Sequence, residues 1–322
     1  MNDHSSSTKK VGKLLICVFD KAVNLLILLF LMIFFTYGIY SIWDGQQVLT
    51  SAQSSQYETY KPQEENSLSF QELQKINPEV FSWLSVYGTG IDLPVAQGED
   101  NEKYVNTNVT GNYSMSGSLF LDYRNKNNFS DFSSIIYGHH MAESAMFGDL
   151  DKFQEESFFE DHRYGNLFFQ GRDYGLEFYA FLQVDALDQS VYSTPIIGTE
   201  NQEKYLTNIK EKAKYYRETS ISSEDRIILL STCAEDSTSG RYILVGVLRE
   251  QPFSIPEALK ESNLKNGQQF TTQAASFIQE IKFSQLQRFG LLVATFLLLL
   301  SWYLFLIYQR QHPKKGGPYA KK

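Results

Sequence analysis

Cysteine is scarce in this chain of 322 residues, which contains only Cys17 and Cys233. Cys17 lies beside an apolar N-terminal run and Cys233 lies far downstream in a polar context, so a disulfide between them is implausible. The sequence therefore predicts a fold that holds together without disulfides. Cys233 is left as a free thiol, which is either a small buried hydrophobe or a reactive group.

Metal and nucleotide motifs are also absent from the sequence. No phosphate-binding glycine loop and no Cys/His cluster at zinc spacing occurs. Cys233 with His139 and His140 could in principle hold zinc, but adjacent histidines do not easily converge on one ion and no fourth ligand stands at a standard spacing. We predict no metal and no cofactor.

Charge is missing from two long apolar runs, residues 22–43 and residues 289–308. Each has about 20 residues, enough to cross roughly 30 Å of hydrocarbon as a helix. The first run could instead be a cleaved signal peptide, because lysines precede it. It is longer than a usual signal core, however, and "YSIWDGQQ" offers no small-x-small cleavage site. We predict two transmembrane helices, the first of them an uncleaved anchor.

The flanking charges predict the orientation of both spans. Lysines precede the first span, and Arg310 and four lysines follow the second, so the ends 1–21 and 309–322 should be cytoplasmic. Residues 45–287, which would then lie outside the cell, carry 34 Asp and Glu against 19 Lys and Arg. Such an acidic domain argues against nucleic acid as a partner.

Between the spans we expect an extracellular stalk over 44–66, a domain over 67–252 and a connector over 253–288. Residues 68–84 have a rough helical spacing that Pro78 breaks. Seven short β-type runs, bounded by Gly, Asn, Asp and Ser, suggest a mostly antiparallel barrel or sandwich. The segment 200–216 has an apolar stripe opposite Lys and Glu, which predicts an amphipathic helix packed across the strands.

A reactive thiol needs a base or a cation nearby. The region between the spans has three histidines, His139, His140 and His162. His139 and His140 end a β-type run, and since adjacent side chains on a strand point to opposite faces, at most one of them can face a site with Cys233. Either could also be an ordinary surface histidine, and His162 lies in a charged loop where that reading is favoured.

Arg241 opens the β-type run that follows Cys233. The seven intervening residues, "AEDSTSG", are turn formers, so the two runs can pair as an antiparallel hairpin that brings Arg241 near Cys233. A guanidinium there could stabilise charge on a carbonyl oxygen. Alternatively, Arg241 could be a surface residue that pairs with Glu235 or Asp236.

The order "YGHHM" (137–141), "LSTC" (230–233) and Arg241 resembles the sortases, membrane-anchored cysteine transpeptidases of Gram-positive bacteria that have a closed β-barrel. The resemblance covers residues 68–248. It points to class B through "NPEVFSWL" (77–84), "GTGIDLPVAQGEDNEKYV" (88–105), "GSLFLDYRN" (117–125) and "MFGDL" (146–150). It implies a barrel of about seven to eight strands with N-terminal helices and a long helix before the strand of Cys233.

The resemblance also implies roles for the site residues. Cys233 would be the nucleophile, His139 the general acid/base and Arg241 the group that stabilises the oxyanion and the substrate. Ser231 and Thr232 could contact the substrate or serve strand packing. The family cleaves a C-terminal sorting motif of exported proteins after Thr, through a thioester, and transfers the acyl group to an amine without a metal or a cofactor.

The acceptor stays open. A second, C-terminal span is more typical of class C sortases, which polymerise pilins, yet the Asp-Pro-aromatic lid motif of that class is absent from residues 44–70. The acceptor could be a pilin lysine, which we favour slightly, or a peptidoglycan cross-bridge amine. Two other functions remain as alternatives: an exported cysteine peptidase that only hydrolyses, and a non-catalytic scaffold for pilus or wall assembly.

Overall fold

The computed structural model describes residues 3–62, 68–142, 144–233, 240–256 and 259, and the chain up to Ile255 forms one compact unit. The helices in the described residues are α1 (Asp3–Ala52), α2 (Leu68–Ile76), α3 (Glu156–Asp161), α4 (Gln189–Tyr192) and α5 (Thr199–Lys212). Four short 3₁₀ turns accompany them, at Ser54–Gln56, Glu58–Tyr60, Lys103–Val105 and Gly148–Gln154.

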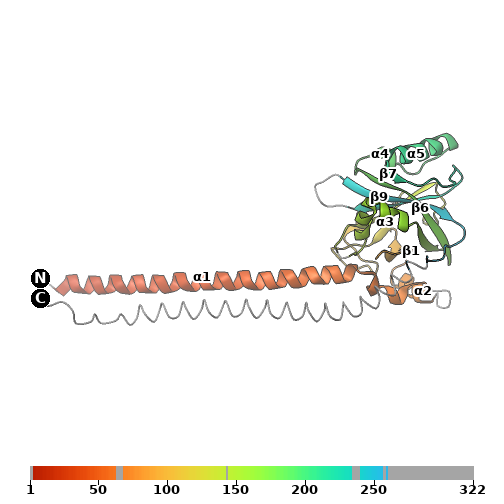
Figure 1. Ribbon diagram of the computed structural model, residues 1–322. Helices are drawn as coiled ribbons and strands as arrows, with labels where there is room; N and C mark the ends of the chain where they lie inside the picture. The colour runs from red at the N-terminus through yellow and green to blue at the C-terminus, as the bar shows by residue number, and fades with distance from the viewer. Residues whose placement is uncertain (1–2, 63–67, 143, 234–239, 257–258, 260–322) are drawn as a thin grey trace. The chain divides into compact units, whose positions relative to one another are not determined.

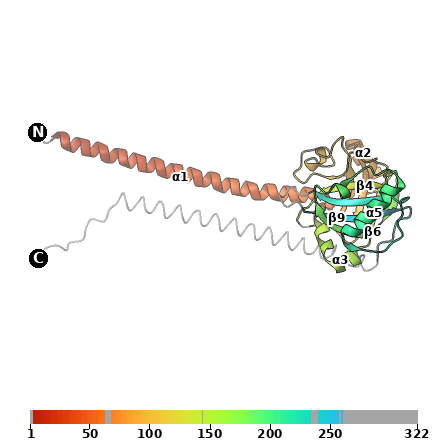
Figure 2. The ribbon, with the colours of Figure 1, turned by 90° about the horizontal axis from the view of Figure 1, so that it is seen from above.

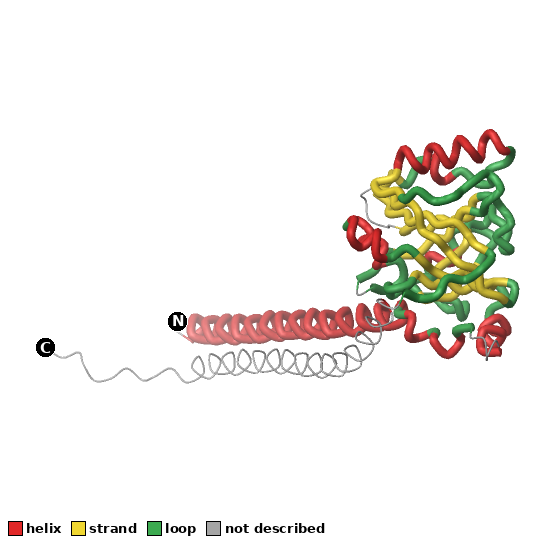
Figure 3. The backbone as a smooth tube through the Cα atoms, turned by 45° about the vertical axis from the view of Figure 1, so that its right-hand side comes forward, coloured by secondary structure: helices red, strands yellow, loops and turns green. Residues whose placement is uncertain are grey.

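The strands form a closed barrel (Figures 1 and 3). They are β1 (Val80–Val86), β2 (Asp92–Ala96), β3 (Leu119–Leu121), β4 (Ser133–His139), β5 (Tyr164–Phe169), β6 (Arg172–Asp185), β7 (Ala213–Tyr216), β8 (Ile227–Cys233) and β9 (Gly240–Arg249). The sheet order is β5-β1-β2-β3-β4-β8-β9-β6-β7, and a further pairing of β5 with β6 closes the ring. Eight strands make the barrel and β7 pairs with β6 beside it, which confirms the predicted closed barrel.

Two apolar clusters lie on opposite faces of the late strands. In β8, Ile228 and Leu230 belong to the barrel interior, whereas Ile227 and Leu229 belong to a second cluster with α5. This alternation follows from the two-residue period of a strand. Helix α5 lies against β6 on the outside of the barrel and adds Tyr205 and Ile209 to the second cluster (Figure 2).

Two predicted helical segments end earlier in the structure than their apolar spacing indicated. The segment 68–84 is helical only to Ile76, since Pro78 disfavours helical backbone at the residue before it, and β1 begins at Val80. The helix expected over 200–216 ends at Lys212, and Ala213–Tyr216 pairs with β6 as β7 instead. Their apolar side chains fit a strand as well as a helix, and pairing with neighbouring strands, β2 and β5 for β1 and β6 for β7, selects the strand.

The segment expected to be a stalk, 44–66, packs on the barrel over part of its length. Helix α1 continues through Ala52, and Ala52 and Tyr57 are buried in the barrel core. The Tyr57 hydroxyl donates to the Ser51 carbonyl oxygen over 3.2 Å, and Lys61 pairs with Asp92 at the start of β2. The apolar residues Leu49, Ala52, Tyr57 and Tyr60 explain why this polar-looking segment docks.

One helix within the described residues, Leu15–Ala52, is long and apolar enough to cross a membrane. It includes the predicted first span, 22–43. The predicted second span, 289–308, and most of the predicted connector lie outside the described residues. Phe253, where the connector was expected to begin, still packs on the barrel. The centroid of its ring lies 4.3 Å from that of Tyr164, and its carbonyl oxygen accepts a hydrogen bond from the Tyr87 hydroxyl.

Candidate active site at the ends of β4, β8 and β9

His139 and Cys233 end two neighbouring strands. Strands β4 and β8 pair in parallel from Ser133 and Ile227 onward, and the last pair in this register is His139 with Cys233. Parallel strands finish at the same edge of a sheet, so residues almost a hundred positions apart become direct neighbours. The sequence predicted that these two residues act together, and the parallel register is the feature that brings their backbones together.

Arg241 comes to the same edge from the other side of β8. Strands β8 and β9 are antiparallel, as the hairpin reading predicted, and their register runs from Ile227 with Val247 to Ser231 with Ile243. Cys233 and Arg241 each lie two residues beyond that last pair, at the same edge of the sheet. The Arg241 Nη1 donates to the carbonyl oxygen of Thr232 over 3.3 Å, which holds the guanidinium at the end of β8.

The two adjacent histidines have different environments. His139 is 9% exposed, and its Nε2 lies 2.8 Å from the carbonyl oxygen of Val105. The side chain of His140 is 41% exposed and its Nε2 lies 3.4 Å from a carboxylate oxygen of Asp151. His139, the last residue of β4, is thus a buried and held imidazole, whereas His140 just after the strand faces solvent.

His162 belongs to a packing arrangement at the end of α3. Its ring stacks on that of Phe158, with the two ring centroids 3.7 Å apart, and its Nδ1 lies 2.8 Å from the Phe158 carbonyl oxygen. Burial lowers the pKa of His162, which favours the neutral ring. Among the described residues no three His, Cys, Asp or Glu side chains gather as metal ligands would.

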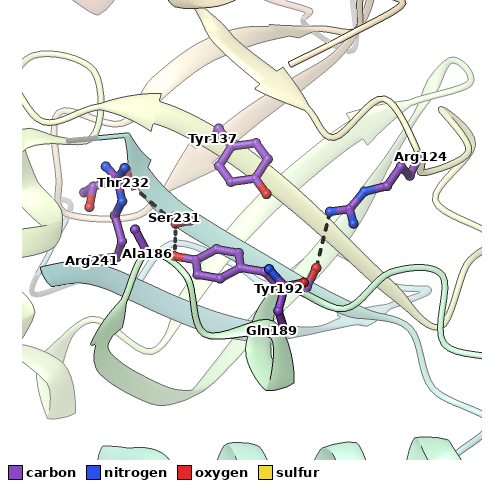
Figure 4. Close-up of a pocket in the computed structure, with 8 residues that line it drawn as sticks. All are labelled: Arg124, Tyr137, Ala186, Gln189, Tyr192, Ser231, Thr232 and Arg241. Carbon is purple, nitrogen blue, oxygen red and sulfur yellow. Dashed lines mark hydrogen bonds between the residues drawn. The ribbon is translucent and has the colours of Figure 1, made fainter. Parts of the chain in front are cut away.

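A cavity of about 240 Å³ opens beside these strand ends (Figure 4). In Figure 4 two tyrosine rings lie between Arg241 at one end and Arg124 at the other. The rings of Tyr137 and Tyr192 are nearly parallel, with centroids 6.4 Å apart. The residues that line the cavity are Arg124, Tyr137, Ala186, Gln189, Tyr192, Ser231, Thr232 and Arg241.

Ser231 and Thr232 are buried and hold the cavity walls in place. The Ser231 Oγ lies 2.9 Å from the Tyr192 hydroxyl oxygen. The Thr232 Oγ1 accepts from the backbone N–H of Tyr242 over 3.2 Å, and the Thr232 carbonyl oxygen accepts from Arg241. Both residues line the cavity, as substrate contacts would, but their hydrogen bonds are made to the protein.

A buried carboxylate supports the far wall of the cavity. Asp122 is fully buried and accepts from the Arg124 Nε over 2.8 Å, from the Arg124 Nη2 over 2.7 Å and from the Tyr137 hydroxyl over 3.1 Å. Burial alone would raise the pKa of Asp122, but the hydrogen bonds and the charge of Arg124 outweigh it and lower that pKa. Burial and the neighbouring Asp122 raise the pKa of Tyr137, which therefore remains a hydrogen-bond donor.

Sequence reasoning missed the residues of this wall. Tyr137 stands two positions before His139 in "YGHHM" and so shares its face of β4, which was a usable signal. Asp122 and Arg124 belong to "GSLFLDYRN", and their spacing of two residues did not show that they pair. Tyr192 and Gln189, on α4, reach the cavity through tertiary packing for which no local pattern exists.

The barrel thus places a cysteine, a histidine and an arginine at the ends of three adjacent strands, and these are residue types that thiol-dependent acyl transfer uses. No family model matches the chain. Sortase B of Listeria monocytogenes is 35% identical over 179 residues, which cover 55% of this chain and 72% of that protein.

Two solved structures agree with that relationship. The structure of sortase B from the type II pilus of Streptococcus pneumoniae is 44% identical, with a TM-score of 0.50, and the match covers 56% of this chain and 99% of that one. A Streptococcus pyogenes class B sortase involved in pilus biogenesis is 41% identical, with a TM-score of 0.52, over 56% and 97% of the two chains. The chain belongs to the class B sortases and is a cysteine transpeptidase.

Proposed function

We propose that this sortase cleaves a C-terminal sorting motif of exported proteins after Thr and joins the new C-terminus to a pilin lysine. The observation that carries the proposal is the register of β4, β8 and β9, which brings Cys233, His139 and Arg241 to one edge of the barrel beside a cavity. We assign Cys233 as the nucleophile, His139 as the general acid/base and Arg241 as the oxyanion-stabilising and substrate-binding residue.

The proposed reaction has two acyl transfers. The Cys233 thiolate attacks the Thr carbonyl carbon, Arg241 stabilises the oxyanion, and His139 protonates the departing amine as the carbon–nitrogen bond breaks. In the second step an acceptor amine attacks the thioester and gives its proton to His139, and the thiolate leaves. Besides the peptide and the acceptor amine, these steps use three side chains of the protein, those of Cys233, His139 and Arg241.

The cavity suits an extended peptide. Its walls offer aromatic faces, Tyr137 and Tyr192, against which apolar side chains or a proline of a sorting motif can pack. Arg241 and Arg124 place cationic donors at its two ends, where peptide carbonyl groups can accept hydrogen bonds. Ser231 and Thr232 would then act on the substrate by fixing Tyr192 and Arg241.

Two streptococcal sortases favour a pilin lysine as acceptor. One comes from a type II pilus and the other is involved in pilus biogenesis, and they are 44% and 41% identical to this chain. A peptidoglycan cross-bridge amine is the competing acceptor. We further propose that the enzyme is a two-pass protein of the cell membrane with both termini in the cytoplasm. The apolar helix Leu15–Ala52 supports the first anchor, and the uncharged run 289–308 supports the second.

The acceptor can be tested with the purified full-length chain in detergent micelles. A sorting-motif peptide is offered with either a lysine-containing peptide or a glycine peptide that imitates a cross-bridge, and mass spectrometry identifies the products. We expect the branched product through the lysine side chain to dominate. A product through the glycine amine alone would support wall anchoring, and hydrolysis with every amine would support the cysteine peptidase.

A further inference from the structure

We propose that the loop Tyr104–Ser118 fixes the ring of His139 through the carbonyl group of Val105, so that Nδ1 is the nitrogen that exchanges protons during catalysis. In this view Gly117 is a positioning residue, because it lets the loop pack close enough to present that carbonyl group. The inference rests on the proposed role of His139 as general acid/base.

The contact between His139 and Val105 fixes the tautomer. The Nε2 of His139 lies 2.8 Å from the Val105 carbonyl oxygen. A carbonyl oxygen only accepts, so Nε2 must carry the hydrogen in both the neutral and the charged ring. In the neutral ring Nδ1 is then the free base, and in the charged ring Nδ1–H is the acid.

Hydrogen bonds at both ends hold the loop. The Ser118 backbone N–H donates to the Tyr104 carbonyl oxygen over 3.0 Å, and the Ser118 Oγ donates to the Thr107 carbonyl oxygen over 2.8 Å. The buried Tyr104 donates its hydroxyl to Glu79 over 2.6 Å, outside the loop. These bonds keep Val105, which lies between Tyr104 and Thr107, in a defined position.

Gly117 is the tightest point of the loop. Its φ is +57°, and a Cβ atom there would lie 2.4 Å from the carbonyl oxygens of both Tyr104 and Val105. Any side chain at 117 must therefore push away the oxygen that binds His139. Gly111 in the same loop provides a matched comparison, because its φ is +85° and a Cβ there would meet nothing within 4 Å.

The proton balance follows from this assignment. The thiol proton of Cys233 moves to Nδ1, which leaves a thiolate and an imidazolium whose Nε2–H stays on Val105. When the carbon–sulfur bond forms and the scissile carbon–nitrogen bond breaks, Nδ1 gives its proton to the leaving amine. The acceptor amine later returns a proton to Nδ1, the carbon–sulfur bond breaks, and the thiolate is restored.

The first test measures the tautomer directly, by ¹⁵N NMR of the full-length chain in micelles with labelled histidine. His139→Gln identifies the His139 signals. We expect Nε2 to be protonated and Nδ1 to be bare in the neutral ring. A neutral ring protonated at Nδ1 would overturn the proposal without any loop variant.

The second test compares Gly117→Ala with Gly111→Ala, which share left-handed backbone strain but not the clash. We expect Gly117→Ala to lower kcat by about 100-fold with a much smaller change in KM, since misplacing a catalytic group by about 1 Å costs that much. Its His139 signals should lose the defined tautomer, while Gly111→Ala keeps the wild-type tautomer and kcat. Wild-type kcat and tautomer in Gly117→Ala, or equal effects of the two variants, would refute the positioning role.

The outcomes also separate this inference from the proposed function. If His139→Gln kept full transpeptidation, the general acid/base assignment would fail, whatever the tautomer. If His139→Gln were inactive but Gly117→Ala behaved as wild type, the assignment would stand and only the loop inference would fail.

Discussion

Arg241 is the residue whose chemistry is hardest to replace. It is the second residue of β9, donates to the Thr232 carbonyl oxygen and lines the cavity. A guanidinium offers several donors in one plane, whereas an ammonium is a single charged point on a flexible stem. The proposed oxyanion role of Arg241 therefore calls for arginine and not merely for a positive charge.

Arg241→Lys should lower kcat by about 100-fold, the typical loss when one donor to an oxyanion is removed. The measurement is the rate of transpeptidation of a sorting-motif peptide by the full-length chain. Arg249→Lys is the matched control, since Arg249 lies at the other end of β9 and pairs with Glu177 and Asp225. Near-wild-type turnover of Arg241→Lys would remove Arg241 from the mechanism.

The adjacent histidines provide a second comparison of single residues. His139→Ala should abolish transpeptidation, because it removes the buried imidazole of the residue that pairs with Cys233 across β4 and β8. His140→Ala removes an exposed ring that pairs with Asp151 and should keep most of the activity. Steady-state rates with peptide and amine measure both. If the two variants changed places, the assigned face of β4 would be wrong.

Residue-level reasoning from the sequence reached His139, Cys233 and Arg241 because each ends or begins a β-type run. It did not reach Asp122, Arg124 or Tyr192. Asp122 forms its bonds across β3 and β4, and Tyr192 comes from α4, so their meeting depends on tertiary packing. Short motifs identify reactive groups, and only the fold identifies the groups that support them.

Among the secondary-structure elements, β3 and β4 are joined by Asp122, which follows β3 and accepts a hydrogen bond from Tyr137 of β4. The ion pair of Asp122 with Arg124 fixes one end of the cavity. The lowered pKa of Asp122 means that its ionised form stabilises the folded state. That contribution is complete above the unfolded pKa, about 3.9, and is lost as the pH falls through the folded value.

Asp122→Asn should reduce the free energy of unfolding by about 1 to 3 kcal/mol at pH 7, because bonds to a charged group are lost. The difference between wild type and variant should shrink as the pH falls below about 4. Denaturant unfolding of the purified chain at several pH values measures it, with Glu203→Gln on the exposed face of α5 as control. A difference that stays constant in acid would contradict the ionised pair.

Helices and strands were predicted best where turn-forming residues mark both of their ends. The runs that became β4, β8 and β9 were each bounded by polar turns, and the closed barrel was anticipated. Strand β1 was missed because residues 68–84 also fit a helical spacing, and β7 was missed because 213–216 continue the apolar stripe of α5. Both strands exist because a neighbouring strand accepts their backbone groups, which a local pattern does not record.

For the molecule as a whole, the end of α1 and the turns that follow it are part of the barrel's core. Ala52 and Tyr57 are buried there, and the Ser51 Oγ lies 3.4 Å from the Ser116 Oγ. Ser116 belongs to the loop Tyr104–Ser118 that holds His139. The same junction therefore joins the predicted membrane anchor both to the barrel and to the loop beside the site.

Tyr57→Ala should lower the free energy of unfolding by about 3 kcal/mol, as expected when a buried aromatic side chain is removed. Tyr113→Ala, in which the lost ring is 78% exposed, should change stability little. Denaturant unfolding of the two purified variants gives the comparison. Equal stability would mean that residues 51–60 do not pack on the barrel.

Intact-protein mass spectrometry can show whether Cys233 carries the acyl group. The full-length chain is mixed with a sorting-motif peptide in the absence of an acceptor amine, and the protein mass is followed with time. We expect an adduct whose mass equals that of the peptide up to Thr. It should be located on Cys233, be released by hydroxylamine and be absent from Cys233→Ala. Turnover without such an adduct, or turnover by Cys233→Ala, would contradict the role of Cys233 as nucleophile.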